Sequence, residues 1–367
     1  SHYYLHNFIL SSYFYTQTCF CFCFSSLQLM KEFDYEKLVT ATDGFSPSRL
    51  IGKGSHGFVY EGLLHEDDKR HRVVAIKTPS LSPSSSSSSL FEKSEQMKKL
   101  ENEINVLSSL PCSPHVLSFL GHAEKRLMVV EFMPNGTLHQ LLHVSTTAPP
   151  PPPTWLKRIE IALQIARAVR FLHEQGILHR DIKSDNILFD SNWEPKLADF
   201  GLAAHLADEK RPAPAGTIGY LDPCYTCPEN LSTKVDIYSY GVVLLEIVSG
   251  RKAIDVTRSP ASIVDWAVPL INEGKIGEIF GGGGSGVFVG TNLRLLRMAA
   301  RCVSSDAESR PSAGEITAEI VLCLTGPLTL KSLPLWMSFF RGVVKLKRRR
   351  KRLRETLTWP GQTCQVR

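Results

Sequence analysis

The first thirty residues of this 367-residue chain contain no Asp, Glu, Lys or Arg, and they are rich in Phe, Tyr and Cys. The stretch is long enough for the roughly 20 residues of a membrane-spanning helix, but Ser, Thr, Gln, Asn and His are interspersed through it. The chain also begins without an initiator methionine, and Met30 is the first one. We interpret residues 1–30 as an uncharged, aromatic-rich leader outside the fold, with a truncated membrane span as the alternative.

A recognisable secretory signal is missing, and so is a paired set of cysteines. The nine cysteines are odd in number and scattered along the chain, which favours reduced thiols in the cytosol over a disulfide framework. Cys224 and Cys227 have the C-x-x-C spacing of a zinc half-site, but no second ligand pair lies near them in the sequence. Because structural zinc needs about four ligands, we do not expect a metal at these cysteines.

The excess of positive charge is confined to one segment. The formal net charge is +6, but residues 345–354 (KLKRRRKRLR) hold eight Lys or Arg and no acid, which leaves −2 for the rest of the chain. We treat residues 326–367 as a basic C-terminal tail. Attraction to an anionic membrane surface is one interpretation, since clustered basic residues gain about 1 kcal/mol each there. A nuclear signal or nucleic-acid patch and a disordered, solubilising tail are the alternatives.

Hydrophobic patterning predicts a β-rich part followed by a helical part. Short β-branched runs between Gly turns predict strands from Leu50 to Val74, and Val129 to Met133 reads as a buried strand that ends at the turn Pro134-Asn135-Gly136. Apolar residues at helical spacing predict helices over 91–110, 155–173 and 235–248, and the last is apolar enough to lie in the core. Loops are expected at Ser80–Ser89, at the prolines 149–153 and at Gly281–Gly284.

Two motifs in the β-rich part suit phosphate binding. The segment 52–59 (GKGSHGFV) is rich in glycine, which lets the backbone approach phosphate groups without a Cβ in the way. Residues 73–77 (VVAIK) read as a strand that ends in Lys77. A lysine at phosphates needs a carboxylate to hold it, and Glu103 in the predicted helix has a suitable position. Glu101 lies two residues away and therefore faces elsewhere on the helix.

The most informative stretch is 179–186 (HRDIKSDN), followed by 199–201 (DFG). It places a proton acceptor, a cation and two metal-ligating side chains on two adjacent loops. Phosphoryl transfer depends mainly on positioning and charge neutralisation, so it needs such a set. Each motif is weak alone, but all of them, in this order and at these separations, resemble the protein kinase family.

The resemblance covers roughly residues 33–325 and implies an α+β, two-lobed protein kinase fold. A small β-rich N-lobe (51–130), a hinge (131–135) and a larger, mostly helical C-lobe (136–325) would follow a lead-in segment (31–50). The same resemblance implies ATP and Mg²⁺ as cofactors and a protein with Ser or Thr as substrate.

The family's roles carry over to matching positions. Asp181 would accept the proton of the substrate hydroxyl, and Lys183 would neutralise the transferred phosphoryl group. Asn186 and Asp199 would hold magnesium, while Lys77 and Glu103 would position the phosphates. The resemblance implies nucleotide contacts from Ile51, Gly52, Lys53, Gly54, Ser55, His56, Gly57, Phe58, Val59, Ala75, Lys77, Glu131, Met133 and Leu188, with Val130 as the gatekeeper.

Further segments resemble one subfamily, the plant receptor-like cytoplasmic kinases. These are 41–46 (ATDGFS), 216–223 (GTIGYLDP) and 236–255 (DIYSYGVVLLEIVSGRKAID), and Lys183 with Thr217 is typical of Ser/Thr rather than Tyr kinases. We therefore expect an ATP-dependent serine/threonine kinase in intracellular signalling, with a pseudokinase scaffold as the alternative. An upstream receptor kinase is an expected partner, and specific nucleic-acid binding is not expected. The expected location is cytoplasmic, peripheral at the plasma membrane through residues 345–354, with a nuclear location as the alternative.

The chain departs from the family pattern at one buried ion pair. Kinases usually place a Glu seven residues after Thr217, and this Glu pairs with an arginine that corresponds to Arg310. The position holds Cys224, and Glu229 comes five residues later. A buried arginine needs a partner, so either Glu229 reaches Arg310 or Arg310 finds another acceptor.

A second departure concerns the loop before Thr217. In relatives, an arginine at the position of Arg180 usually pairs with a phosphate on this loop. Residues 202–216 (LAAHLADEKRPAPAG) contain no Ser, Thr or Tyr. We expect Asp208 or Glu209 to supply the negative charge instead.

Overall fold

The computed structural model describes residues 31–54, 57–67, 70–79, 90–124, 126–144, 153–280 and 289–325. The expected leader (1–30), serine loop (80–89), glycine run (281–284) and basic tail (326–367) lie outside these ranges, as do prolines 149–152.

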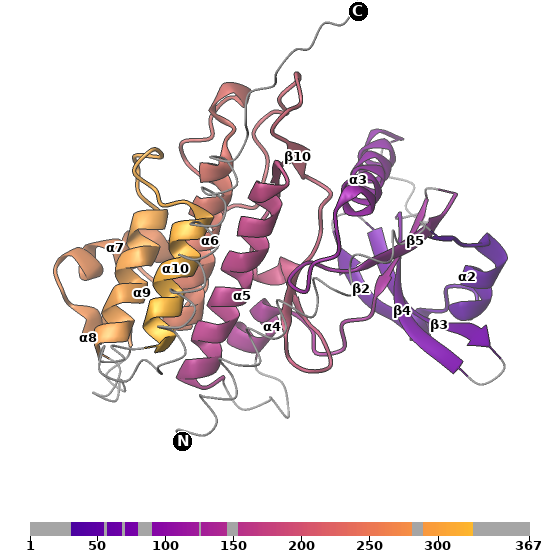
Figure 1. Ribbon diagram of the computed structural model, residues 1–367, viewed down its shortest axis with the longest axis horizontal. Coiled ribbons are helices and arrows are strands. Elements are labelled where there is room, and N and C mark those ends of the chain that lie inside the picture. Colours follow the sequence, from indigo (N-terminus) through magenta and orange to yellow (C-terminus); the bar gives the residue numbers. More distant parts are fainter. Residues whose placement is uncertain are drawn as a thin grey trace, which may run out of the picture. The chain divides into compact units, whose positions relative to one another are not determined.

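The first half of the described chain builds a six-stranded sheet in the order β1-β5-β6-β4-β3-β2. Only β1 and β5 pair in parallel, and the other neighbours are antiparallel. Figure 1 shows this sheet with helices α2 and α3 beside it. The expected β-rich N-lobe is confirmed, although β6 begins and ends two residues before the predicted strand. The bounds are β1 (Lys31–Glu32), α2 (Tyr35–Ala41), β2 (Leu50–Gly54), β3 (Gly57–Asp67), β4 (Arg70–Thr78), α3 (Leu90–Ser109), β5 (Phe119–Ala123) and β6 (Leu127–Glu131).

The lead-in segment packs on this sheet. Asp34 caps α2, since its carboxylate accepts a hydrogen bond from the Glu36 N–H at 2.9 Å. Leu38 of α2 is 0% exposed and belongs to the same apolar cluster as Val74 and Ile76 of β4. Residues 31–41 therefore add one edge strand and one covering helix to the N-terminal sheet.

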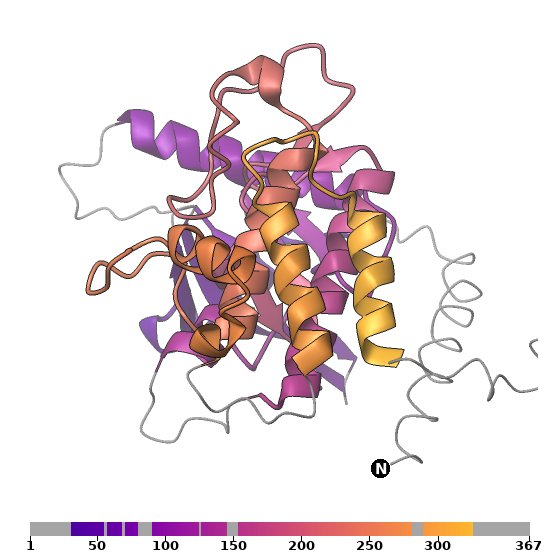
Figure 2. The same cartoon turned by 90° about the vertical axis from the view of Figure 1, so that its left-hand side faces the viewer.

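The second half is mostly helical and is organised around α6. All residues from Val235 to Val248 are buried, as their composition predicts, and α5, α7 and α9 contact this helix. In both views α9 and α10 run roughly alongside each other (Figures 1 and 2). None of the helices in the described ranges combines the length and the apolar composition that crossing a membrane requires. The helices are α4 (Leu138–His143), α5 (Trp155–Glu174), α6 (Thr233–Ser249), α7 (Ile263–Asn272), α8 (Ile276–Ile279), α9 (Val289–Cys302) and α10 (Ala313–Thr325).

Short strands and single turns complete the two halves. Strand β8 pairs with β9 and β7 with β10, both antiparallel. The bounds are β7 (Ile177–Leu178), β8 (Ile187–Phe189), β9 (Pro195–Leu197) and β10 (Ala204–His205), with 3₁₀ turns at Pro47–Arg49, Ser184–Asn186 and Pro228–Asn230. A sheet followed by a helical part confirms the expected two-lobed α+β fold.

Arg310, just before α10, is buried and has an acceptor other than Glu229. Its Nη2 donates to Asp222 Oδ1 at 2.8 Å, and its Nη1 donates to Asp222 Oδ2. Nε donates to the Ser304 carbonyl at 2.9 Å, and Nη2 also reaches Cys224 Sγ at 3.3 Å. Asp222 thus takes the role usually played by a Glu two residues later, while Glu229 is exposed.

Arg310→Ala is expected to lower the free energy of unfolding by about 3–5 kcal/mol, because it leaves the Asp222 carboxylate buried without its cation. The matched control is Arg258→Ala. Its ion pair with Asp255 is 3.0 Å long, but the arginine side chain is 62% exposed, so the loss should stay below about 1 kcal/mol. Denaturant unfolding followed by tryptophan fluorescence measures both values. Equal losses of unfolding free energy in the two variants would contradict the role of Arg310 as the buried ion-pair partner of Asp222.

His115 lies where the chain crosses from α3 to β5. Its carbonyl accepts from the Leu197 N–H at 2.9 Å, and the Leu117 N–H donates to the Leu197 carbonyl at 3.0 Å. These two hydrogen bonds attach residues 115–117 to β9. Burial, helped by the positive charges of Arg167 and Lys196, lowers the pKa of His115 to about 4. The Nδ1 atom is buried without a hydrogen-bond partner. The imidazole is therefore neutral in the folded protein at neutral pH.

This shift predicts loss of stability in mild acid. The pKa of His115 is about 4 in the folded chain and near 6.5 in the unfolded chain. The contribution of the neutral imidazole to the free energy of unfolding is therefore complete above pH 6.5 and is lost as the pH falls towards 4. From pH 7 to 5 this amounts to up to about 2 kcal/mol. His115→Asn should flatten the dependence of unfolding free energy on pH, whereas the exposed-residue control His205→Gln should retain it. Parallel curves for all three proteins would refute the role of His115.

Candidate active site

The β2–β3 hairpin carries the glycine-rich segment. Gly54 pairs with Gly57 next to the turn of the hairpin, and the turn residues Ser55 and His56 lie outside the described residues. Gly57 has φ +135°, and a Cβ there would lie 1.9 Å from the Thr78 carbonyl oxygen. Only glycine fits, which brings the hairpin directly against the end of β4. Ile51 and Lys53 are exposed on this hairpin, and the Lys53 ammonium lies 5.6 Å from the centre of the Phe58 ring.

Lys77, near the end of β4, lies between two carboxylates from different segments. Its Nζ is 2.5 Å from Glu103 Oε2 on α3 and 3.2 Å from Asp199 Oδ1. Glu103 is only 1% exposed and Lys77 is 12% exposed, so the pair is largely shielded from water. Burial alone would lower the pKa of Lys77, but the two carboxylates outweigh it and raise that pKa, so the ammonium stays charged. Sequence reasoning correctly expected the contact with Glu103.

Asn102, next to Glu103, is a residue that sequence reasoning missed. Its Nδ2 lies within 2.9–3.3 Å of the carbonyls of Phe200, Gly201 and Ala203. Glu103 Oε1 accepts from the Phe200 N–H at 3.3 Å. Helix α3 therefore fixes the course of the chain directly after Asp199. The available signal was only the polar pair Asn102-Glu103 on an otherwise amphipathic helix.

Asp236 of α6, which is 0% exposed, attaches the loop 179–186 to that helix. Its carboxylate accepts from the backbone N–H groups of His179 and Arg180 at 2.9 and 2.8 Å and lies 3.0 Å from His173 Nε2. Burial raises the pKa of Asp236, but the hydrogen bond and charge of His173 outweigh this and lower it, so the carboxylate is ionised. Asp236 was also missed as a site residue, although it opens a quoted family motif.

The polar side chains of this loop converge on Asp181. Thr217 Oγ1 donates to Asp181 Oδ1 at 2.6 Å, and Lys183 Nζ lies 2.8 Å from both Asp181 Oδ2 and Thr217 Oγ1. Asn186 Nδ2 donates to the Asp181 carbonyl at 2.8 Å. The structure thus brings together one carboxylate, one ammonium and one hydroxyl in a closed triangle.

Asn186 and Asp199 fit the oxygen preference of magnesium. The Asn186 Nδ2 is committed to Asp181, which leaves its amide oxygen as the atom for a metal. Ile187 pairs with Leu197 across the β8–β9 hairpin, and the Ala198 N–H donates to the Asn186 carbonyl at 2.9 Å. The hairpin therefore holds Asn186 and the segment before Asp199 at one end. A carboxylate and an amide oxygen are suitable ligands for Mg²⁺.

An apolar surface lies beside these polar groups. Ala75 and Val130 are opposite each other on β4 and β6 and are 6% and 4% exposed. The partly buried residues Val59, Met133 and Leu188 pack on the same core cluster. The Glu131 N–H donates to the Ser118 carbonyl, and its carboxylate binds Lys196 Nζ at 2.7 Å. Of the backbone groups of Glu131, its carbonyl is therefore the one suited to a ligand.

The prediction that Asp208 or Glu209 supplies the negative charge beside Arg180 is wrong. The guanidinium donates to the carbonyls of Leu202 and Ala213, at 2.8 and 2.5 Å, and to the Tyr225 hydroxyl at 3.0 Å. Asp208 and Glu209 are exposed, and the Asp208 carboxylate accepts from the His205 N–H within its own turn. Neutral oxygen acceptors from the folded loop take the place of a fixed anion.

Comparison with known proteins agrees with this geometry. The protein kinase domain family matches residues 45–320. A serine/threonine-protein kinase-like protein of Arabidopsis thaliana is 78% identical over 345 residues, which is 92% of this chain and 100% of that protein. A second one from the same plant is 44% identical over 299 residues, 78% of each chain. A proline-rich receptor-like protein kinase from Arabidopsis is 35% identical over 302 residues, 77% of this chain and 42% of its own.

The family match covers strands β2 to β6, both polar loops and helices α3 to α9, whereas β1 and α2 precede it. Two of these relatives are described as serine/threonine-protein kinase-like proteins, and the third is described as a receptor-like protein kinase. The chain belongs to the protein kinase family, as a plant serine/threonine protein kinase.

Proposed function

We propose that the chain is catalytically active and transfers the γ-phosphoryl group of ATP to a Ser or Thr hydroxyl of a protein. The observation that carries this proposal is the cluster of Lys77, Glu103 and Asp199, with Nζ–O distances of 2.5 and 3.2 Å. Such a cluster joins the sheet, α3 and the loop after β9 in one arrangement, and phosphoryl transfer requires that arrangement. A pseudokinase scaffold needs none of it.

Each residue of the site has a separable task. Lys77 presents a fixed positive charge to the phosphates, and Glu103 keeps that charge in place. The oxygens of Asn186 and Asp199 would hold magnesium, which would neutralise phosphate charge. Val59 and Ala75 on one side and Leu188 on the other enclose the adenine, while the backbone of Glu131 and Met133 bonds its edge.

Asp181 and Lys183 orient the acceptor. Asp181 already accepts a hydrogen bond from an alcohol, the Thr217 hydroxyl, at 2.6 Å. A substrate Ser or Thr presents the same group, so Asp181 can orient it and take its proton. Lys183 lies 2.8 Å from Asp181 Oδ2 and offers its charge to the transferred phosphoryl group.

The finer assignments rest on resemblance. Similarity to receptor-like kinases supports a receptor-like cytoplasmic type, an upstream receptor kinase as partner, and action in the cytoplasm. Attachment to an anionic membrane through residues 345–354, and the nuclear alternative, concern residues outside the described ranges and stay predictions.

Lys77→Ala and Asp181→Asn should each lower phosphotransfer by roughly 10²-fold or more, the first through misplaced phosphates and the second through the lost base. The matched control is Lys98→Ala, because this lysine lies on α3 with its side chain 66% exposed. Circular dichroism checks that the variants fold. Incorporation of labelled phosphate into a generic protein substrate measures turnover. Wild-type protein that binds ATP without turnover would favour the scaffold instead.

Activity should not depend on phosphorylation of residues 202–216, because Arg180 is held by carbonyls and by Tyr225. Phosphatase treatment and the double substitution Asp208→Asn/Glu209→Gln are both expected to leave turnover unchanged. Tyr225→Phe removes one buried acceptor and should lower turnover about tenfold. Loss of activity after phosphatase treatment, or on the double substitution, would contradict this explanation.

A further inference from the structure

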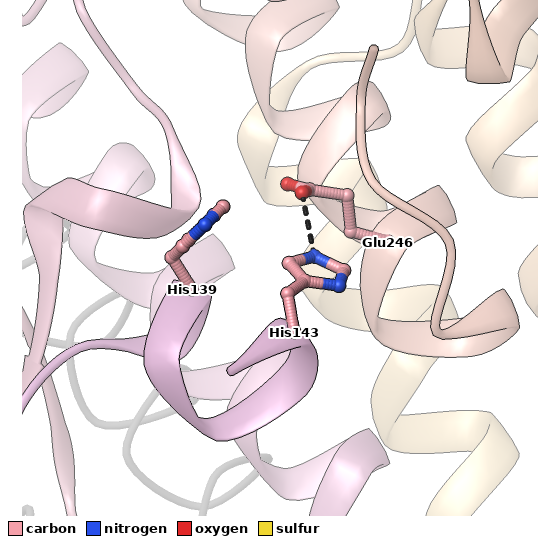
Figure 3. Close-up of side chains that lie close together, drawn as sticks. All are labelled: His139, His143 and Glu246. Carbon is pink, nitrogen blue, oxygen red and sulfur yellow. Dashed lines mark hydrogen bonds and ion pairs between the residues drawn. The ribbon is translucent and has the colours of Figure 1, made fainter. Parts of the chain in front are cut away.

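Helix α4 presents two histidines to the core helix α6. The Thr137 hydroxyl and the Gln140 side chain cap the helix reciprocally, at 3.1 and 3.0 Å. His139 and His143 are four residues apart and therefore lie on the same face, with ring centres 5.0 Å apart. Figure 3 shows both rings on the side of α4 that faces Glu246.

Glu246 completes the group from α6. Its Oε1 is 3.0 Å from His143 Nε2 and 3.3 Å from the Ser184 hydroxyl, and its Oε2 accepts from the Tyr220 hydroxyl at 2.8 Å. One nitrogen of each histidine and one oxygen of Glu246 all lie within 4.8 Å of one another. Ligand atoms around tetrahedral zinc, at about 2.0–2.2 Å from the metal, are separated by roughly 3.4 Å. Small side-chain rotations would thus reach zinc geometry.

The charge of Glu246 also points to a cation. Its side chain is 0% exposed, and its hydrogen-bond partners in the described part of the chain are His143, Tyr220 and Ser184. None of them carries the permanent charge that a Lys or Arg would bring. A buried carboxylate without such a partner is costly, and a divalent ion would supply the missing charge.

We propose that His139, His143 and Glu246 bind a zinc ion that fastens α4 to α6 behind the loop 179–186. Two imidazoles and one carboxylate favour zinc over magnesium, which prefers oxygen ligands. His139 is 30% exposed and opens the site to solvent. Asp185 Oδ2, 3.8 Å from His139 Nδ1 and 54% exposed, or a water supplies the fourth ligand.

The arrangement couples the metal to the segment around Thr217, although zinc on Oε1 would replace the contacts of that oxygen with His143 and Ser184. Zinc engages Oε1 of Glu246, so Oε2 keeps its bond to Tyr220, three residues after Thr217. Ser184 lies between Tyr220 and His139, at 2.9 and 3.4 Å, in the loop that carries Asp181. The ion therefore acts as a structural clamp on that loop, and its binding does not depend on phosphotransfer.

The test uses the full chain without a histidine tag, kept reduced and stripped with a chelator. Zn²⁺ is titrated in competition with a chromogenic chelator in excess Mg²⁺, and the melting temperature is followed in parallel. Wild-type protein should take up one equivalent and melt at a higher temperature with zinc. His139→Gln should weaken binding at least about 10–100-fold. Its partly exposed position makes this variant safe for folding.

Two further variants distinguish zinc binding at this site from zinc binding by other groups of the chain. Glu246→Gln keeps an acceptor for Tyr220 but removes the charge, and it should lose the same equivalent. His205→Gln changes an exposed histidine elsewhere and should bind as wild type does. Cobalt in place of zinc should give visible absorption without the thiolate bands of a cysteine site. Zinc uptake that persists unchanged in both His139→Gln and Glu246→Gln, or the absence of uptake by wild-type protein, overturns the proposal.

Discussion

The contact on which the site depends is the buried ammonium of Lys77 between Glu103 and Asp199. It ties a strand, a helix and a loop to one point, and the chain around it makes further contacts. Glu103 also accepts from the Phe200 N–H, and Asn102 grips the following carbonyls. Removing one partner leaves a largely buried charge uncompensated, so each of the three segments depends on the other two for its place in the site.

Helix α6 is the second organising element, and it works through three polar residues on an otherwise apolar helix. Asp236 suspends the loop 179–186 by two backbone N–H groups, Ser239 donates to the Tyr220 carbonyl at 2.7 Å, and Glu246 accepts from the Tyr220 hydroxyl. Their spacing of three and seven residues places them on one face. The other positions from Val235 to Val248 are buried and mostly apolar, so a helix anchored in the core positions the loop 179–186 and the segment around Tyr220 together.

Much of the fold and of the candidate site was predictable from the sequence, because the periodicity of apolar residues indicates which positions are buried and the motifs indicate the chemistry. The helices around Leu100, Val169 and Val243 and the pair Lys77–Glu103 lie where the patterns indicated. What failed were acceptors chosen by sequence position alone. Asp222 was overlooked for Arg310, and Asp208 and Glu209 were preferred for Arg180, because sequence spacing does not show which carbonyls and hydroxyls a folded loop brings within hydrogen-bonding distance. Asn102 and Asp236 were missed for the same reason, since both act on the backbone of distant segments.

The binding of Arg180 has a physical consequence for control. In a loop ordered by a phosphate, the arginine binds a group with charge about −1.5 to −2, and removing the phosphate leaves the arginine without its anion. Here the guanidinium binds the dipoles of two carbonyls and the hydroxyl of Tyr225, itself bonded to the Pro212 carbonyl at 2.9 Å. Hydrogen bonds from a charged donor to neutral acceptors are worth about 1.5–3 kcal/mol each, and these acceptors are part of the fold. The contacts that hold Arg180 therefore come from the fold itself and include no phosphate.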